Sequence, residues 1–193
     1  MRCISCARLS WRVICDRCRR ELFATEIHTR TVGTLDVISF YRYTTLEPLL
    51  LTKHKPEGYR VYKALSKMLL RPFIGEFVES LGEKEEVYIV GVDEVVKSGY
   101  SHVALLTHGM KMPQVRVQHG ALLAQNRVSY AGKPLQYRLD HPRDFRYSGK
   151  RGVDAILVDD IVTTGITLQE AQKVLLGHGV NVLFALTLAD AAE

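Results

Sequence analysis

Short apolar runs alternate along the chain with segments whose apolar residues recur at helical spacing. Continuous runs lie at residues 87–92 and 155–158, and shorter or interrupted ones at residues 115–117 and 180–187. Continuous apolar runs of this length are typical of strands buried on both faces of a sheet. Residues 101–108 and 168–176 have the spacing of amphipathic helices. The alternation predicts a parallel α/β sheet whose strands are joined by right-handed crossovers and flanked by helices.

Other patterns precede and interrupt this core. Residues 31–44 are rich in β-branched and aromatic side chains and predict strands. Residues 59–81 predict a helix that Pro72 kinks or splits. Residues 118–152 are polar, basic and irregular, and we expect them to form a mobile flap.

The chain is organised around residues 156–167, where a buried strand is followed by two acids and a threonine-glycine loop. Thr167 and Glu170 have the spacing of a capping box, which predicts that a helix begins there. Helix N–H groups, the helix dipole and the loop hydroxyls favour an anion, and a glycine permits close approach of the backbone. The acids would repel phosphate, so sugar hydroxyls or a divalent cation would suit them. The alternative is a strand-turn-helix with ordinary capping residues.

The composition is that of a soluble globular protein. The chain has 193 residues, of which 47% are hydrophobic and 24% charged, and its net charge is +5. No segment has the long apolar run of a membrane-spanning helix, and the first residues lack the core of a signal peptide. We expect a cytoplasmic protein, with peripheral attachment at the inner face of the membrane left open. The modest basicity permits polyanions such as nucleic acids as partners.

All four cysteines lie near the start of the chain, in two Cys-x-x-Cys pairs. They are Cys3, Cys6, Cys15 and Cys18. The spacing predicts a structural zinc site with four thiolate ligands, in a segment too short to have its own apolar core. A reducing compartment argues against disulfides, and a pair of redox motifs is the alternative.

Arginines surround these cysteines, with Trp11 between them; Arg12, Arg19 and Arg20 are the candidates for binding phosphate. Two interpretations stay open. The arginines form a solvated surface and Trp11 docks onto the rest of the protein, or the arginines contact phosphates while Trp11 stacks on a base.

The stretch from Val158 to Thr167 resembles the phosphoribosyl-pyrophosphate (PRPP) motif of type I phosphoribosyltransferases. The resemblance implies that Asp159 and Asp160 contact the ribose hydroxyls and stabilise positive charge on the ribose during catalysis. It implies that the 5′-phosphate is bound by Thr163, Thr164, Gly165, Ile166 and Thr167.

Together with the cysteine segment, the whole chain resembles the ComF (ComFC) family of competence proteins, which act in natural transformation. The resemblance implies a zinc ribbon over residues 1–30 and a phosphoribosyltransferase-like domain over residues 31–193. Lys53 lies where the family has a basic residue ahead of its long helix. The chain departs from the family at the loop expected to grip pyrophosphate, for which Asp93, Lys97 and Gly99 are the candidates. Asp93 and Glu94 bring negative charge there, so either Mg²⁺ bridges them to pyrophosphate or pyrophosphate binds weakly.

Three functions follow from these resemblances. The first is a DNA-uptake protein that handles incoming single-stranded DNA together with a helicase-like ATPase. The second is an enzyme that transfers ribose 5-phosphate from PRPP, with Mg²⁺, to an unknown acceptor. The third is a regulator that senses PRPP or another ribose-5-phosphate ligand without chemistry.

Overall fold

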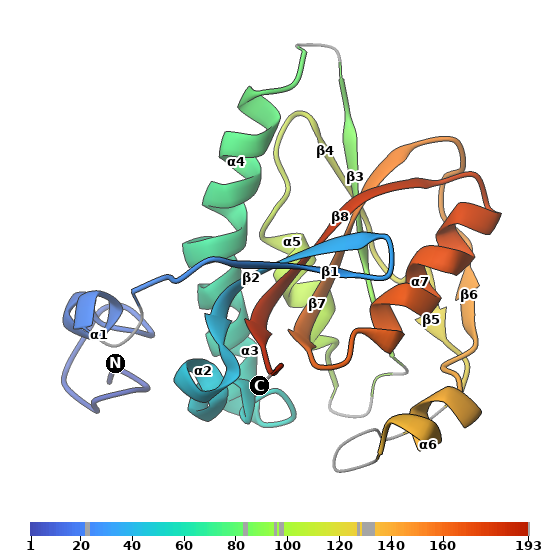
Figure 1. Cartoon of the computed structure of the whole chain (residues 1–193). Coiled ribbons are helices and arrows are strands. Elements are labelled where there is room, and N and C mark those ends of the chain that lie inside the picture. Colours follow the sequence, from blue (N-terminus) through green and yellow to red (C-terminus); the bar gives the residue numbers. More distant parts are fainter. Residues whose placement is uncertain are drawn as a thin grey trace.

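The computed structural model describes residues 1–21, 24–82, 85–94, 96, 99–126, 128 and 134–192. In this part of the chain a six-stranded sheet has the order β1-β2-β8-β7-β3-β4, and only the β1–β2 pair is antiparallel (Figure 1). The strands are β1 (His28–Val32), β2 (Leu35–Arg42), β3 (Val87–Gly91), β4 (Val115–Gln118), β7 (Asp154–Val162) and β8 (Asn181–Asp190). The predicted α/β fold with a mostly parallel sheet is confirmed.

The sheet is buried on both faces by helices. One face is covered by α2 (Tyr43–Leu50), α3 (Pro56–Leu65), α4 (Arg71–Glu79) and α5 (His102–His108), and the other by α7 (Ile166–Gly177) (Figure 1). Alternate residues of β7 contribute to the two cores: Ile156 and Val158 to the first, Leu157 to the second. All three side chains are fully buried, as the apolar run of this strand predicts.

The predicted long helix is split, as expected, near Pro72. Helix α3 passes into a π-helical turn, η1 (Ser66–Leu70), and then into α4, which has Pro72 in its first turn. Pro72 has no N–H to donate to the preceding turn, and the wider π turn accommodates the missing bond. Oγ of Ser66 donates to the carbonyl of Leu106 at 2.5 Å, which joins this turn to α5.

The prediction of an irregular flap over residues 118–152 is wrong at both ends of that segment. β5 (Leu122–Ala124) pairs with β6 (Phe145–Tyr147), and α6 (Leu135–Asp140) lies between them in the sequence. β5 is also hydrogen-bonded to the chain after β3, since the N–H of Asp93 donates to Leu122 and its carbonyl accepts from Ala124. Backbone pairing fixes this segment beside the carboxyl end of the sheet.

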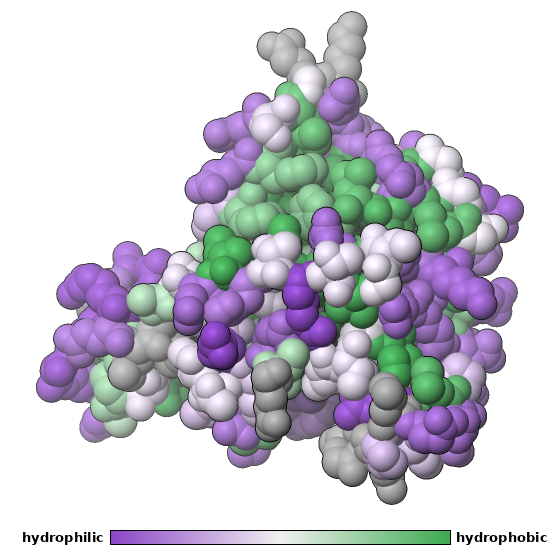
Figure 2. Space-filling view, in the orientation of Figure 1, coloured by the Kyte–Doolittle hydropathy of each residue, from purple (hydrophilic) through white to green (hydrophobic). Residues whose placement is uncertain are grey.

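The N-terminal cysteine segment includes α1 (Asp16–Glu21) and lies to the left in Figure 1. Its surface is largely hydrophilic, whereas hydrophobic surface gathers over α4 and the adjacent sheet (Figure 2). Cys3, Ile14 and Cys18 are nevertheless buried and belong to the same core as Tyr41. The cysteine segment, which is too short for an apolar core of its own, therefore shares the core on one face of the sheet. Strand β1 begins at His28, ahead of the predicted boundary at residue 30.

Candidate functional site

The two acids of the central motif lie within β7, which extends to Val162 beyond the apolar run that predicted it. Adjacent residues of a strand point to opposite faces. Asp160 is only 5% exposed, whereas Asp159 is half-buried. Asp160 is therefore more deeply buried than Asp159, although both acids line the cavity described below.

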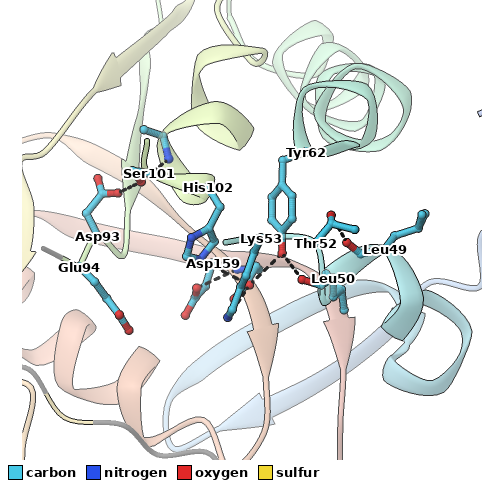
Figure 3. Close-up of polar contacts among 12 residues, drawn as sticks. Leu49, Leu50, Thr52, Lys53, Tyr62, Asp93, Glu94, Ser101, His102 and Asp159 are labelled. Carbon is cyan, nitrogen blue, oxygen red and sulfur yellow. Dashed lines mark hydrogen bonds and ion pairs between the residues drawn. The ribbon is translucent and has the colours of Figure 1, made fainter. Parts of the chain in front are cut away.

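Asp160 lies in a polar cluster with Lys53, Tyr62 and His102, three residues that Figure 3 labels. Its Oδ2 accepts from Nζ of Lys53 at 3.1 Å and from the hydroxyl of Tyr62 at 3.2 Å, and lies 3.4 Å from Nε2 of His102. The Tyr62 hydroxyl also lies 3.3 Å from the carbonyl of Leu50. These contacts join β7 to the segment after α2, to α3 and to α5, which is the arrangement of a structural carboxylate.

The surroundings of the two acids move their pKa values apart. Burial raises the pKa of Asp160, but Lys53 and His102 outweigh it, and the pKa lies below its ordinary value. Burial and the neighbouring Asp160 charge raise the pKa of Asp159 well above its ordinary value. Burial lowers the pKa of His102. Asp160 is the ionised acid of the pair, and Asp159 is the acid that gains most from a ligand donating hydrogen bonds or supplying positive charge.

Asp159 faces a cavity of about 190 Å³ at the carboxyl end of β7. The cavity is lined by Lys53, Val92, Glu94, His102, Arg138, Arg143, Phe145, Asp159, Asp160, Ile161, Thr163 and Thr167. Oδ1 of Asp159 accepts from the N–H of Asp160 at 2.8 Å, which fixes the orientation of the carboxylate. Carboxylate, hydroxyl and cationic groups therefore meet in one cavity, which is suited to a phosphorylated sugar.

The threonine-glycine loop leads from β7 into α7. Gly165 adopts φ +81° and precedes the helix, and a Cβ at this position would lie 2.3 Å from Cγ1 of Val32. Glycine is thus required both by the left-handed backbone and by the neighbouring strand β1. The first N–H groups of a helix have no partner within the helix, so those of α7 are available to an anion.

The predicted capping box is not formed. Helix α7 begins at Ile166, and Gly165 supplies no side-chain cap. The carboxylate of Glu170 instead accepts from the N–H groups of Arg143 and Asp144, at 3.0 and 2.7 Å. Glu170 therefore joins α7 to the segment before β6 and leaves the start of α7 open toward the cavity.

The residues predicted to grip pyrophosphate have separate roles. Asp93 is 5% exposed and accepts a hydrogen bond from Oγ of Ser101 at 2.6 Å, while the same Oγ caps α5 (Figure 3). Gly99 is exposed with φ +81°. Lys97 lies outside the described residues. Glu94 pairs with Arg143, so the negative charge of Glu94 is balanced by a cation in the protein, whereas Asp93 accepts from a neutral hydroxyl.

The cysteines meet as their spacing predicts. The Sγ atoms of Cys3, Cys6, Cys15 and Cys18 all lie within 4.8 Å of one another. The Cys3–Cys18 and Cys6–Cys15 pairs are separated by 3.9 and 3.7 Å. Four thiolates at tetrahedral zinc lie roughly 3.8 Å apart. Backbone N–H groups of Cys15 and Cys18 also point at the sulfurs of Cys3 and Cys15, at 3.3 and 3.5 Å, as in the second shell of a metal site. These residues fit a structural zinc ion.

A groove of about 510 Å³ separates the cysteine segment from α3 and η1. It is lined by Met1, Trp11, Arg12, Val13, Ile14, Arg19, Tyr59, Arg60, Lys63, Ala64, Lys67 and Met68. Trp11 is 98% exposed, so it does not dock onto the protein as one sequence interpretation proposed. Asp16 pairs with Arg12 and Arg19, and Arg20 lines a neighbouring hollow instead.

Sequence reasoning missed several of these residues. The cations of α3 and η1 recur at positions 60, 63 and 67, a helical spacing that would have identified one basic face. Tyr62, His102 and Arg138 carried no signal, because the fold brings them to β7 from distant segments.

No protein-family model matches the chain, and no match is found among curated proteins. Solved structures of phosphoribosyltransferases resemble it in fold. A hypoxanthine phosphoribosyltransferase from Staphylococcus aureus is 15% identical, with TM-score 0.42; the match covers 66% of this chain and 64% of that enzyme. An adenine phosphoribosyltransferase from Saccharomyces cerevisiae is 15% identical, with TM-score 0.42; the match covers 89% of this chain and 86% of that enzyme. An orotate phosphoribosyltransferase from Aeropyrum pernix is 16% identical, with TM-score 0.36; the match covers 90% of this chain and 80% of that enzyme.

Similarity at this level concerns the fold, so the chemistry of the site depends on its own residues. Among the described residues, no helix has the length and apolar character needed to cross a membrane.

Proposed function

We propose that the cavity at the carboxyl end of β7 binds the ribose 5-phosphate part of PRPP or of a related ligand. The observation that carries this proposal is Gly165, whose left-handed backbone opens α7 toward the cavity that Asp159 faces. The phosphate would accept from the loop N–H groups and from the hydroxyls of residues 163, 164 and 167. The ribose hydroxyls would donate to Asp159, which the high pKa of this acid favours.

Mg²⁺ would arrive with the pyrophosphate of PRPP, since it prefers phosphate and carboxylate oxygens. Asp159 is the carboxylate in position to meet it, because Asp160 and Glu94 are engaged by Lys53 and Arg143. The metal would neutralise charge on the leaving pyrophosphate. If the protein is a phosphoribosyltransferase, Asp159 would also stabilise positive charge on the ribose.

Thr167→Val should weaken binding of ribose 5-phosphate about tenfold, because it removes one hydrogen bond to a charged phosphate and keeps the side-chain shape. Calorimetry measures this directly. Gly165→Val should abolish binding, through backbone strain and contact with Val32.

The matched control is Gly152→Val, which introduces a similar strain at φ +64° with no neighbour within 4 Å of the new Cβ. Equal affinity of wild type, Thr167→Val and Gly165→Val for ribose 5-phosphate would contradict the proposed site.

The groove supports a second function, binding of single-stranded DNA. Trp11 and Tyr59 offer aromatic faces to bases, while Arg12, Arg60 and Lys63 offer charge to phosphates. Nζ of Lys63 lies 5.8 Å from the ring centre of Tyr59, so charge and aromatic surface are adjacent. This chemistry agrees with the DNA-uptake role implied by the ComF resemblance, in which the protein would handle incoming strands beside a helicase-like ATPase.

Trp11→Ala should weaken binding of a labelled single-stranded oligonucleotide by about tenfold, the effect of losing one stacked base. Arg60→Gln with Lys63→Gln should also lower the dependence of affinity on salt, because fewer counterions are released. Fluorescence anisotropy at several salt concentrations measures both. Lys173→Gln, an exposed charge change on α7, is the control. Wild-type affinity and salt dependence in the groove variants would show that the groove does not hold the strand.

A further inference from the structure

The phosphate side of the cavity contains an arginine that does not belong to the central motif. Arg138 lies on α6, and its Nη1 donates to Oγ1 of Thr163 at 2.7 Å. Arg138, Thr163 and Thr167 line the same cavity. The guanidinium is therefore at the loop where the proposed function puts the 5′-phosphate.

Thr163 is held from its other side by a second arginine. Nε of Arg30 donates to Oδ2 of Asp190 at 2.7 Å, and its Nη2 donates to the carbonyl of Thr163. Asp190 is the last residue of β8, so the loop is tied to the sheet through Arg30. The Thr163 hydroxyl accepts from Arg138 and so has its own proton to donate to a ligand. The backbone of the loop is thus fixed, and the Thr163 hydroxyl and the Arg138 guanidinium line the same cavity.

Helix α6 is ordered by its own contacts. The rings of Tyr137 and His141 stack with centres 4.1 Å apart, and Nε2 of Gln136 donates to Oδ1 of Asp140 at 2.9 Å. These pairs at helical spacing stabilise the turn that carries Arg138. The arginine is therefore presented by a folded turn.

We propose that Arg138 binds the phosphate of the ligand directly and makes the site selective for a dianionic phosphomonoester. This inference rests on the proposed function. A guanidinium has a planar fork of donors that matches two phosphate oxygens, and its charge adds to the dipole at the start of α7. A monoester carries nearly two charges above pH 6 or so, whereas a diester carries one.

The test is calorimetry with ribose 5-phosphate and with its methyl phosphodiester. Wild type should bind the monoester about tenfold more tightly than the diester, the effect of one additional charge-assisted hydrogen bond. Arg138→Ala should weaken monoester binding about tenfold and remove the preference. The affinity of wild type should rise from pH 5 to pH 7.5 as the phosphate loses its second proton, and this rise should be smaller in Arg138→Ala.

Two further variants make the result decisive. Arg146→Ala removes an exposed arginine from β6 in the same segment and should behave as wild type. Arg138→Lys keeps the charge without the fork, so it should retain part of the preference for the monoester. It also replaces Arg138→Ala as the test if the alanine variant does not fold. Unchanged monoester affinity and preference in both Arg138 variants, with Thr167→Val still impaired, would overturn the role of Arg138 alone. No binding of ribose 5-phosphate by wild type would overturn the proposed function as well.

Discussion

Replacing Asp160 by alanine should lower the free energy of unfolding by about 3 kcal/mol, the cost of removing one partner from a buried charge pair. The change leaves the cation of Lys53 and the hydroxyl of Tyr62 without the oxygen they share, which lies 3.1 and 3.2 Å away. Lys53 is 31% exposed and recovers some hydration, but Tyr62 is fully buried and does not. Thermal unfolding should show a melting temperature roughly 6–12 °C below wild type.

Asp159→Ala is the matched control, one residue along the same strand. Folding raises the pKa of the Asp159 carboxyl, so the ionised carboxylate lowers stability at neutral pH. Removing this carboxylate should therefore leave the melting temperature unchanged or slightly higher. The same variant should lose binding of ribose 5-phosphate. Equal melting temperatures for the two variants would contradict the structural role of Asp160.

The pH dependence follows from the same pair. Folding lowers the pKa of Asp160. Its contribution to folding stability is therefore present above the unfolded pKa of 3.8 and is lost as the pH falls through the folded pKa. Folding raises the pKa of Asp159, so its contribution to folding stability depends on pH in the opposite direction. That contribution is present below the unfolded pKa of 3.8 and is lost as the pH rises toward and through the folded pKa. In Asp160→Ala, acid should therefore destabilise the protein less steeply than it destabilises wild type.

Local patterns were sufficient to predict the strands of the main sheet, the helices that follow residue 56, residue 101 and residue 165, and the cysteine cluster, but not α2 or α6. The apolar run before Asp159 predicts a strand buried on both faces, and the cysteine spacing predicts the cluster, because each signal lies within a few residues. The two acids could not be distinguished in this way. The pattern that predicted the strand ended at Val158, and an extension by four residues places the acids on opposite faces.

Long-range contacts determined the remaining features of the site. Glu170 has the spacing of a capping residue, yet it binds backbone N–H groups from before β6, which are absent from any local window. Arg138 reaches Thr163 from 25 residues away in sequence, and Lys53 reaches Asp160 from 107. The topology of the fold brings such partners together from distant parts of the chain. Periodicity and spacing in the sequence therefore identify the threonine-glycine loop but not the cations Arg138 and Lys53 around it.

Loss of the metal should abolish the groove at the N-terminus while leaving the cavity at β7 intact. Cys6 is the exposed cysteine of the cluster, so Cys6→Ser removes one thiolate without disturbing the core that contains Cys3 and Cys18. Structural zinc contributes about 10–16 kcal/mol of binding free energy in small zinc domains, which is folding free energy for a segment of this size. Metal analysis should find one zinc per wild-type chain and little in Cys6→Ser.

The binding measurements separate the two sites. Trp11, Arg12 and Arg19 form one wall of the groove and belong to the cysteine segment. Their displacement should weaken single-stranded DNA binding by at least about tenfold, since stacking and phosphate contacts are lost together. Binding of ribose 5-phosphate should be unchanged, because its cavity is lined by residues from Lys53 onward. A zinc-free Cys6→Ser protein that binds single strands as wild type does would place the nucleic-acid site elsewhere. Loss of both activities would instead indicate that the metal supports the whole fold, through the core that Cys3, Ile14 and Cys18 share with the sheet.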